Sequence, residues 1–322
     1  MSERSTVLLE QPEPPEQRVG RAVSARRRPL RVPLGLIRTA RPRQWIKNVL
    51  VAAAPAAAGE LDSRHTVVQL GVVFALFTAA ASAVYLINDA RDAEADRAHP
   101  VKCTRPVASG DVPAAVACAA GVLLAVAATA AAAVLCNTMT AALLTAYVLM
   151  QIAYCVRLKH VLVVDLAIVT TGFLMRAMIG GVALSIPLSR WFLITAGFGA
   201  LFMVAAKRYS EAVEMAGSDG ATRALLTSYT TGYLRFVWQL AAGVAVLGYC
   251  LWALESGGTA NGSLLPWRQL SMIAFILAVL RYAVFADRGT AGAPEDVVLR
   301  DRPLAVIGLA WLAMYAMAVA DL

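Results

Sequence analysis

The sequence predicts an all-α integral membrane protein, a bundle of nine transmembrane helices. Hydrophobic residues make up 59% of the 322 residues, charged residues make up 16%, and the mean hydropathy is +0.64. A soluble core cannot bury so much apolar surface in a chain of this length. Several apolar runs approach the roughly 20 residues that a helix needs to cross a bilayer. These observations exclude a soluble globular enzyme, and we expect membrane lipids and no nucleic acid as partners.

The N-terminal residues differ in composition from the rest of the chain. Residues 1–36 are rich in proline, glutamate and arginine and lack the apolar core of a signal peptide. They are predicted to form a disordered basic cytoplasmic tail. Its basic run, residues 26–31, is typical of a topology determinant, and it can also contact anionic headgroups. Residues 37–322 are expected to form a single nine-helix transmembrane catalytic domain.

The first helix is predicted to begin in the segment 41–48 (RPRQWIKN) and to run to about residue 59. Pro42 before an apolar run marks a helix start, and Trp45 suits the membrane interface. Lys47 falls at the edge of this span. A charge there is either an edge residue that reaches toward water or a functional residue.

The second helix, about residues 67–87, leads into an acidic segment. Asn88, Asp89, Asp92 and Asp96 follow at spacings that place their oxygens on one face of a continuing helix. Like charges this close repel each other unless a cation neutralises them. Mg²⁺ prefers oxygen ligands and commonly carries substrate phosphates, so the spacing indicates a magnesium site. The alternative is a solvated loop of mixed charge.

Basic residues come directly after the acidic ones. Arg97, Lys102 and Arg105 are of the type that binds phosphate oxygens. Acids followed by bases at the end of a membrane helix favour a site for a magnesium diphosphate.

The third, fourth and fifth helices are predicted at about residues 113–134, 139–154 and 161–184. Tyr154, at the end of the fourth, either orients substrate or anchors the helix at the interface. Lys159 lies in a short basic loop before the fifth helix. Asp165 and Arg176 share one face of the fifth helix, but eleven residues separate them, which is too far along the axis for direct pairing.

The sixth helix is predicted at about residues 191–206 and the last three at about 233–254, 270–285 and 303–320. Lys207, Arg208, Glu211 and Glu214 follow the sixth helix. Glu211 either binds ribose hydroxyls or a metal, or forms a salt bridge with Lys207. Arg235, near the start of the seventh helix, is, like Lys47, either an edge residue that reaches toward water or a functional residue.

The distribution of basic residues sets the orientation. With nine crossings, 23 of the 29 Lys and Arg residues fall on the side of the N-terminal tail, against three on the other side. The positive-inside rule therefore places the tail and the acidic segment in the cytoplasm, and we expect a multi-pass protein of the plasma membrane. The five cysteines and three histidines are scattered without metal-ligand spacing.

These segments resemble the UbiA-type intramembrane prenyltransferase superfamily, in its branch that joins 5-phosphoribosyl diphosphate to a polyprenyl (decaprenyl) phosphate. The resemblance covers the chain from about residue 41 onward. Its most specific segments are 41–48 (RPRQWIKN), 88–106 (NDARDAEADRAHPVKCTRP), 158–160 (LKH), 207–211 (KRYSE) and 233–238 (YLRFVW). Such members release magnesium diphosphate, and this branch serves cell-wall arabinan precursors.

The chain departs from the wider superfamily after the sixth helix. Typical members carry a second aspartate-rich motif there, whereas this chain has Lys207, Arg208, Glu211 and Glu214. Bases in place of acids reduce the need for a second metal and supply cations for a further phosphate. This fits a donor that bears both a 5-phosphate and a 1-diphosphate.

The resemblance implies a role for each site residue. Asp92, Asn88, Asp89 and Asp96 are the expected catalytic residues, with Asn88, Asp92 and Asp96 as Mg²⁺ ligands. Donor phosphates are expected to bind Lys102, Arg105, Lys159, Lys207 and Arg208, with Tyr154 and Glu211 nearby, and the lipid phosphate is expected to bind Lys47 and Arg176.

Two other functions share some of these features. A prenyltransferase that moves an isoprenoid from its diphosphate to an aromatic acceptor would use the same acidic segment. A lipid transporter or flippase would use intramembrane charges along a path across the bilayer, but here the charges lie mostly at one face. The sequence also leaves a homo-oligomer open.

Overall fold

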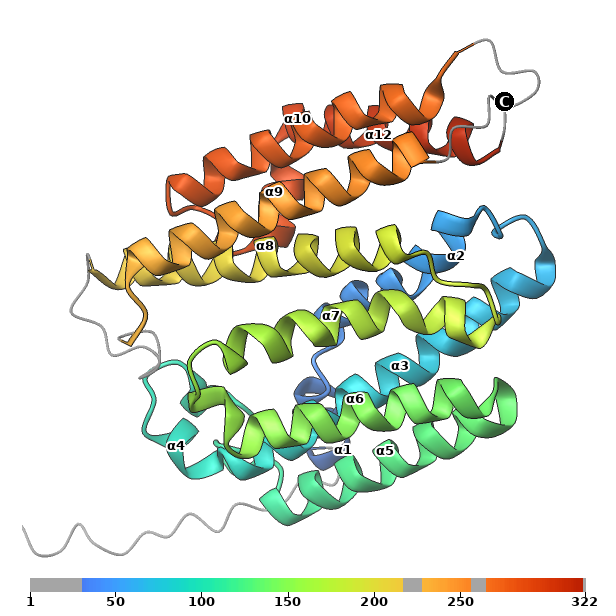
Figure 1. The fold of residues 1–322 in the computed structure, drawn as a ribbon. Coiled ribbons are helices and arrows are strands. Elements are labelled where there is room, and N and C mark those ends of the chain that lie inside the picture. The colour runs from blue at the N-terminus through green and yellow to red at the C-terminus, as the bar shows by residue number, and fades with distance from the viewer. Residues whose placement is uncertain (1–30, 217–227, 256–264, 321–322) are drawn as a thin grey trace, which may run out of the picture.

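The computed structural model describes residues 31–216, 228–255 and 265–320, and helices account for nearly all of these residues (Figure 1). Before the first long helix come α1 (Arg31–Thr39), the 3₁₀ helix η2 (Pro42–Ala52) and α2 (Ala53–Ala58). The remaining elements are α3 (Arg64–Arg91), α4 (Ala93–Arg97), η3 (Lys102–Thr104), α5 (Ala114–Leu135), α6 (Thr138–Val156), η4 (Leu158–His160), α7 (Val164–Ala183), α8 (Arg190–Ala216), α9 (Thr231–Glu255), α10 (Trp267–Asp287), α11 (Pro294–Arg300) and α12 (Arg302–Val319).

Eight of the described helices are long and apolar enough to cross a membrane. They are α3, α5, α6, α7, α8, α9, α10 and α12, and Figure 1 shows them lying lengthwise beside one another. The all-α membrane fold is therefore confirmed. The first predicted crossing is instead a 3₁₀ helix followed by the short helix α2, so the described residues do not confirm the count of nine.

The eight long helices match the predicted spans, with one clear correction. The sixth was expected to end at about residue 206, but α8 continues to Ala216. Lys207, Arg208, Glu211 and Glu214 therefore lie on its last turns, where the helix fixes their relative positions. The sequence also predicts a loop over residues 207–228, but residues 207–216 belong to α8 and residues 217–227 lie outside the described part of the chain.

The predicted tail can be followed only at its end. Its residues 1–30 lie outside the described part of the chain, and residues 31–36 belong to α1. Inside α1, Gly35 packs so closely on the loop before α5 that an added Cβ would lie 2.3 Å from the Val112 side chain. This helix therefore packs on the loop that follows the acidic segment.

Two apolar clusters form the interior. One joins η2, α3, α5, α6 and α7 around Phe77, Leu144 and Ile179. The other joins α7, α8, α9, α10 and α12 around Phe202 and Trp238. Helix α7 contributes to both clusters, and Figure 1 shows it between the two groups of helices.

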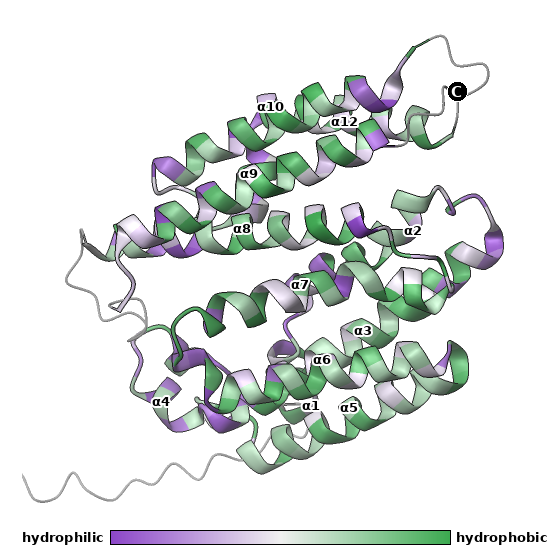
Figure 2. Cartoon of the chain, viewed as in Figure 1, coloured by the Kyte–Doolittle hydropathy of each residue, from purple (hydrophilic) through white to green (hydrophobic). Residues whose placement is uncertain are grey.

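The polar residues of α4 and its neighbouring loops gather at one end of the bundle, as the hydropathy colouring in Figure 2 shows. Helix α3 finishes at this end, and α7 begins there. We call it the motif end, defined by residues 88–106, and the other end the opposite end.

Candidate active site

The acidic segment follows α3 through a small break in the helix. Asp92 caps the end of α3 and precedes α4, with φ −87° and ψ 7°. Its N–H donates to the Asn88 carbonyl at 2.9 Å, and its own carbonyl accepts from the Asp96 N–H at 2.8 Å. The hydrogen bonds from residue i to i−4 thus continue across the break. These hydrogen bonds keep the backbone from Asn88 to Asp96 close to helical.

Two of the acids are buried against arginines. The carboxylates of Asp89 and Asp96 both accept hydrogen bonds from Arg105 Nη1, at 3.3 and 2.7 Å. Asp89 also accepts from Arg41 Nη2 at 2.7 Å, and the Arg41 guanidinium lies 4.7 Å from the centre of the Tyr85 ring. Asp89 and Asp96 are only 2% and 4% exposed. This cluster neutralises two carboxylates and ties the start of η2 to the end of α3.

Asp92 has different surroundings. Its carboxylate keeps 26% of its surface exposed and is paired with Lys159 of η4, whose Nζ lies 3.0 Å from both oxygens. Asn88, one helical turn earlier, is half-buried. These are the two predicted metal ligands that remain accessible at the motif end.

A second charged cluster joins α6, α7 and α8. The Tyr154 hydroxyl donates to Asp165 Oδ1 at 2.5 Å, and Arg208 Nε donates to Asp165 Oδ2 at 3.2 Å. Arg208 Nη1 also donates to Glu211 at 2.9 Å. Asp165 and Arg208 are 2% and 7% exposed. The expected roles of Arg208, in phosphate binding, and of Tyr154, in orienting substrate, therefore compete with strong internal contacts.

Three of the predicted cations are better placed to receive an anion. Lys207 keeps 41% of its side-chain surface exposed, and its Nζ is 3.9 Å from Glu211, at the outer limit of an ion pair. Lys102, in η3, is half-buried and forms no ion pair with a described residue. Lys159 is the third, because its carboxylate partner is itself a candidate metal ligand. The short helix η4 places Lys159 between α6 and α7, which carry the second charged cluster.

Asp165 and Arg176 do not pair, as their spacing predicted. Arg176 lies deeper in α7 and is buried, with its guanidinium near the ring of Phe77. Lys47 is half-buried in η2. Of the two residues expected at the lipid phosphate, Arg176 is thus buried within α7 and Lys47 lies in η2.

Sequence reasoning assigned no role to Arg41 and missed Tyr229. Arg41 has φ +56°, in the left-handed region that side chains rarely adopt. The signal that could have indicated a role for Arg41 is its place in the segment 41–48, which carries part of the family resemblance. The Tyr229 hydroxyl accepts from the Val163 N–H at 2.7 Å, and burial raises its pKa above the usual value. No local pattern distinguishes Tyr229 from an interfacial tyrosine.

Arg235 has a structural role in the described part of the chain. Its Nη2 donates to the Tyr209 hydroxyl at 2.6 Å and lies 3.6 Å from Asp287. These contacts join the motif-end termini of α8, α9 and α10.

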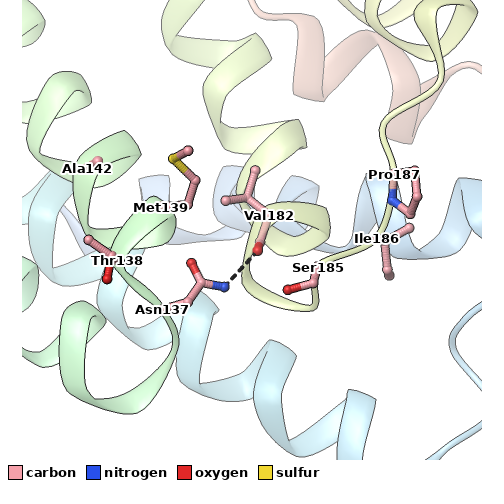
Figure 3. Close-up of a pocket in the computed structure, with 8 residues that line it drawn as sticks. All are labelled: Asn137, Thr138, Met139, Ala142, Val182, Ser185, Ile186 and Pro187. Atoms are coloured by element: carbon pink, nitrogen blue, oxygen red, sulfur yellow. Dashed lines mark hydrogen bonds between the residues drawn. The ribbon is translucent and has the colours of Figure 1, made fainter.

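One hollow in the described part of the chain lies away from this chemistry. A shallow hollow of about 630 Å³ opens at the opposite end, between the start of α6 and the end of α7 (Figure 3). Two of its lining residues are joined by a hydrogen bond, which the Asn137 side chain donates to the Val182 carbonyl at 2.9 Å. The hollow is lined by apolar and neutral polar side chains, without an ionisable group. It offers no charge for a phosphate or a metal.

No cluster of three or more His, Cys, Asp or Glu residues that could hold a metal occurs in the described ranges. The fit to Mg²⁺ is therefore judged on the chemistry of Asn88 and Asp92. An amide oxygen and a carboxylate suit Mg²⁺, which keeps several waters and usually takes one or two carboxylates together with substrate phosphates. The pair fits a metal that arrives with a diphosphate.

Comparisons with known proteins show the family to which the chain is similar. The model of the UbiA prenyltransferase family matches residues 48–299. A decaprenyl-phosphate phosphoribosyltransferase of Mycobacterium tuberculosis is 48% identical over 91% of this chain and 96% of its own length. The enzyme of the same name from Corynebacterium glutamicum is 44% identical, over 88% and 86%.

Solved structures give the same fold at low identity. A UbiA homolog from Archaeoglobus fulgidus bound to DMAPP and Mg²⁺ superposes with a TM-score of 0.65 at 14% identity, covering 89% of this chain and 100% of that one. A structure described for digeranylgeranylglyceryl phosphate synthase has a TM-score of 0.61 at 16% identity, covering 90% and 98%.

Proposed function

The chain belongs to the UbiA prenyltransferase family, and from that premise we propose that it transfers the 5-phosphoribosyl group of 5-phosphoribosyl 1-diphosphate to decaprenyl phosphate, releasing diphosphate. The observation that carries this proposal is the identity of 48% with a named phosphoribosyltransferase over nearly the whole of both chains. The basic residues on the last turns of α8 support the same donor, because it carries a phosphate beyond its diphosphate.

Asn88 and Asp92 are the proposed ligands of a Mg²⁺ ion carried by the donor diphosphate. When bound, the ion would neutralise charge that develops on the departing diphosphate. Binding requires Lys159 to move from the Asp92 carboxylate, since the ammonium group already lies between its two oxygens. We propose that the displaced Lys159 would then bind a phosphate oxygen of the same donor.

Asp89 and Asp96 are proposed to position the arginines of the site. Their carboxylates face Arg105, and Asp89 also faces Arg41. We assign them to holding these arginines at the motif end rather than to direct metal binding. Arg105 keeps 28% of its side-chain surface exposed and can present a remaining N–H to a donor phosphate.

Lys102 and Lys207 are the proposed cations for the other donor phosphates, and Arg208 holds α8 beside α7 through Asp165. Glu211 accepts from Arg208, so it positions that residue, and its partly exposed carboxylate is a proposed contact of the ribose hydroxyls. Charged side chains that are already in place before the substrate arrives need not reorganise during the reaction. Electrostatic catalysis is most effective under this condition.

The reaction forms one bond and breaks one. An anionic oxygen of the lipid phosphate attacks the anomeric carbon of the ribose, and the bond from that carbon to the diphosphate oxygen breaks. The electron pair leaves with the diphosphate. Since the attacking oxygen already carries negative charge near neutral pH, no side chain has to act as a strong general base. The proposed task of the protein is to hold the lipid phosphate beside the donor diphosphate, although the two anions repel each other.

We further propose that the motif end faces the cytoplasm of a plasma membrane. Basic residues concentrate on that side, and a polar sugar diphosphate would reach it from water. The lipid product would supply cell-wall arabinan synthesis. Lys47, half-buried in η2, is the proposed first contact of the lipid headgroup.

Incubation with 5-phosphoribosyl 1-diphosphate labelled in the ribose, Mg²⁺ and a polyprenyl phosphate tests the proposal. The expected product is radioactive and soluble in organic solvent. Absence of that product, together with transfer of an isoprenoid from its diphosphate to an aromatic acceptor, would replace the proposal by the prenyltransferase activity.

A further inference from the structure

Val163, the residue before α7, has a backbone conformation that valine rarely adopts. Its φ is +67° and its ψ is −44°. The Val164 N–H donates to the Leu162 carbonyl at 2.8 Å, which closes a γ-turn of the uncommon, strained kind. A β-branched side chain at positive φ is a steric outlier, and it persists only where surrounding contacts maintain it. We call residues 162–164 the strained turn.

The Tyr229 hydroxyl supplies such a contact from a distant segment. It accepts a hydrogen bond from the Val163 N–H at 2.7 Å, across 66 residues of sequence. Tyr229 lies just before α9 and is 7% exposed. Its ring stacks on that of Tyr233, with the ring centres 5.8 Å apart, and it packs in the apolar cluster around Phe202 and Trp238. Packing thus fixes the ring that presents the hydroxyl to the strained turn.

The strained turn sets where α7 begins. The carbonyl of Val163 accepts from the Ala167 N–H at 2.9 Å, and the carbonyl of Val161, one residue before the turn, accepts from the Asp165 N–H at 3.0 Å. The first turn of α7 is therefore built on residues 161–163. A change of φ at Val163 would redirect the chain where it enters this helix, and the Asp165 side chain would move with it.

Asp165 is the centre of the second charged cluster. Its carboxylate accepts from the Tyr154 hydroxyl and from Arg208 Nε. Because Asp165 and Arg208 are both buried, displacement of this carboxylate would leave Arg208 with Glu211 as its remaining ion-pair partner among the described residues. Lys207, a proposed cation for the donor phosphates, precedes Arg208 on α8. The strained turn is therefore connected to the proposed donor site through a buried ion pair.

The charges of this cluster also act on Tyr229. Burial raises the pKa of its hydroxyl, the Val163 N–H and the charge of Arg208 lower it, and the charge of Asp165 raises it, so that the net pKa lies above the usual value. A phenol with a raised pKa stays neutral near pH 7. Tyr229 can therefore accept the Val163 N–H without adding a negative charge beside Asp165.

We propose that Tyr229 is a positioning residue for donor binding. Its hydroxyl holds the strained turn, and the turn holds Asp165 where it fixes Arg208 on the last turns of α8. The inference rests on the proposed function, since that function supplies a donor whose phosphates are proposed to bind at this end of α8. Tyr229 itself need not touch the donor, because its effect runs through the backbone of Val163.

Relief of the strain by a second substitution separates this role from a general contribution to stability. Tyr229→Phe keeps the ring and its stacking and removes only the hydroxyl. Glycine adopts positive φ without a steric cost, so the turn should persist when Val163→Gly is added. Isothermal titration with 5-phosphoribosyl 1-diphosphate and Mg²⁺ measures donor binding by the purified full-length chain. We expect about tenfold weaker binding by Tyr229→Phe, as for the loss of one hydrogen bond, and recovery of most of that loss in the double variant.

Tyr315→Phe is the matched control. The Tyr315 hydroxyl donates to the Ala57 carbonyl at 3.0 Å, so this variant also loses one hydrogen bond between a tyrosine and a distant backbone group, but at the opposite end. It should bind the donor as the wild-type chain does, even where its melting temperature falls. Hydrogen exchange over residues 161–167, measured without any substrate, should be faster in Tyr229→Phe and unchanged in Tyr315→Phe.

Unchanged donor binding by Tyr229→Phe would overturn the inference. So would a double variant that binds the donor no better than Tyr229→Phe, because the loss would then not act through the strained turn. If Tyr229→Phe does not fold, the double variant decides: recovery of folding and of donor binding supports the inference, and failure of either contradicts it. A wild-type chain that binds no donor would contradict the proposed function alone, and faster exchange over residues 161–167 in Tyr229→Phe would still support the role of Tyr229 at the turn.

Discussion

The ammonium group of Lys159 lies 3.0 Å from each carboxylate oxygen of Asp92, which joins the loop after α6 to the end of α3. The lysine occupies the side of the carboxylate where a metal ion would bind. In the free protein it neutralises the charge that the proposed metal ion would neutralise. This exchange of one cation for another gives the first prediction.

Lys159→Met should separate donor binding from metal binding. Without the ammonium group, the donor loses one phosphate contact, and its KM should rise about tenfold, equivalent to about 1.4 kcal/mol. Mg²⁺ alone should bind at least as tightly as to the wild-type chain, because nothing competes for Asp92. Isothermal titration with MgCl₂ and steady-state kinetics measure the two effects. Weaker Mg²⁺ binding in the variant would contradict the proposed exchange.

Asp92→Asn should abolish turnover while the protein stays folded. The amide keeps the shape of the side chain but loses the charge proposed to hold the metal diphosphate, and loss of a comparable electrostatic contact costs about 100-fold or more in kcat. Initial rates measure the loss of turnover, and the melting temperature shows whether the protein stays folded. Glu94→Gln is the matched control, because Glu94 is an exposed acid of the same segment. Retained activity in Asp92→Asn would remove the metal assignment.

Arg105→Leu should destabilise the fold. Among the described residues, it leaves the buried Asp96 carboxylate without its only ion-pair partner and removes one of two from Asp89. Because Arg105 is partly exposed, we expect a loss of about 2 kcal/mol, less than for a fully buried pair. Thermal unfolding in detergent measures it. Arg43→Leu, at an exposed arginine of the same end, should change the melting temperature little. Equal effects of the two substitutions would show that the cluster is not structural.

Gly180→Ala should also destabilise the bundle, through packing. A Cβ at Gly180 would lie 1.9 Å from the Val51 carbonyl oxygen, so η2 and α7 would have to separate. Overpacking of this kind costs about 1–3 kcal/mol. Gly199→Ala in α8 is the control, since no atom lies within 4 Å of its added Cβ. A Gly180→Ala variant as stable as Gly199→Ala would argue against the close contact.

The long helices could be predicted from the sequence because each is an apolar run near the length that spans a bilayer. Two features escaped that reasoning for physical reasons. Hydropathy does not distinguish a 3₁₀ helix from an α-helix, so the first crossing was expected to be a regular span. Polar residues on the last turns of α8 were read as a loop, although the helix continues through them.

The composition of the site was predictable, and its pairings were not. The spacing of Asp89, Asp92 and Asp96 indicates one face, but it cannot show which acid an arginine will neutralise. Arg41 is 48 residues from Asp89 in the chain, and Lys159 is 67 residues from Asp92. Only the packing of η2 and η4 against α3 separates the buried acids from the accessible one.

The most direct test of the central claim uses the donor in two labelled forms, one with radioactive ribose and one with radioactive β-phosphate. Each is incubated with the wild-type chain, Mg²⁺ and decaprenyl phosphate, and the organic phase is counted. The account predicts that the ribose label enters the lipid and the β-phosphate label stays in water, at rates that Asp92→Asn abolishes. Transfer of both labels to the lipid, or of neither, would contradict it.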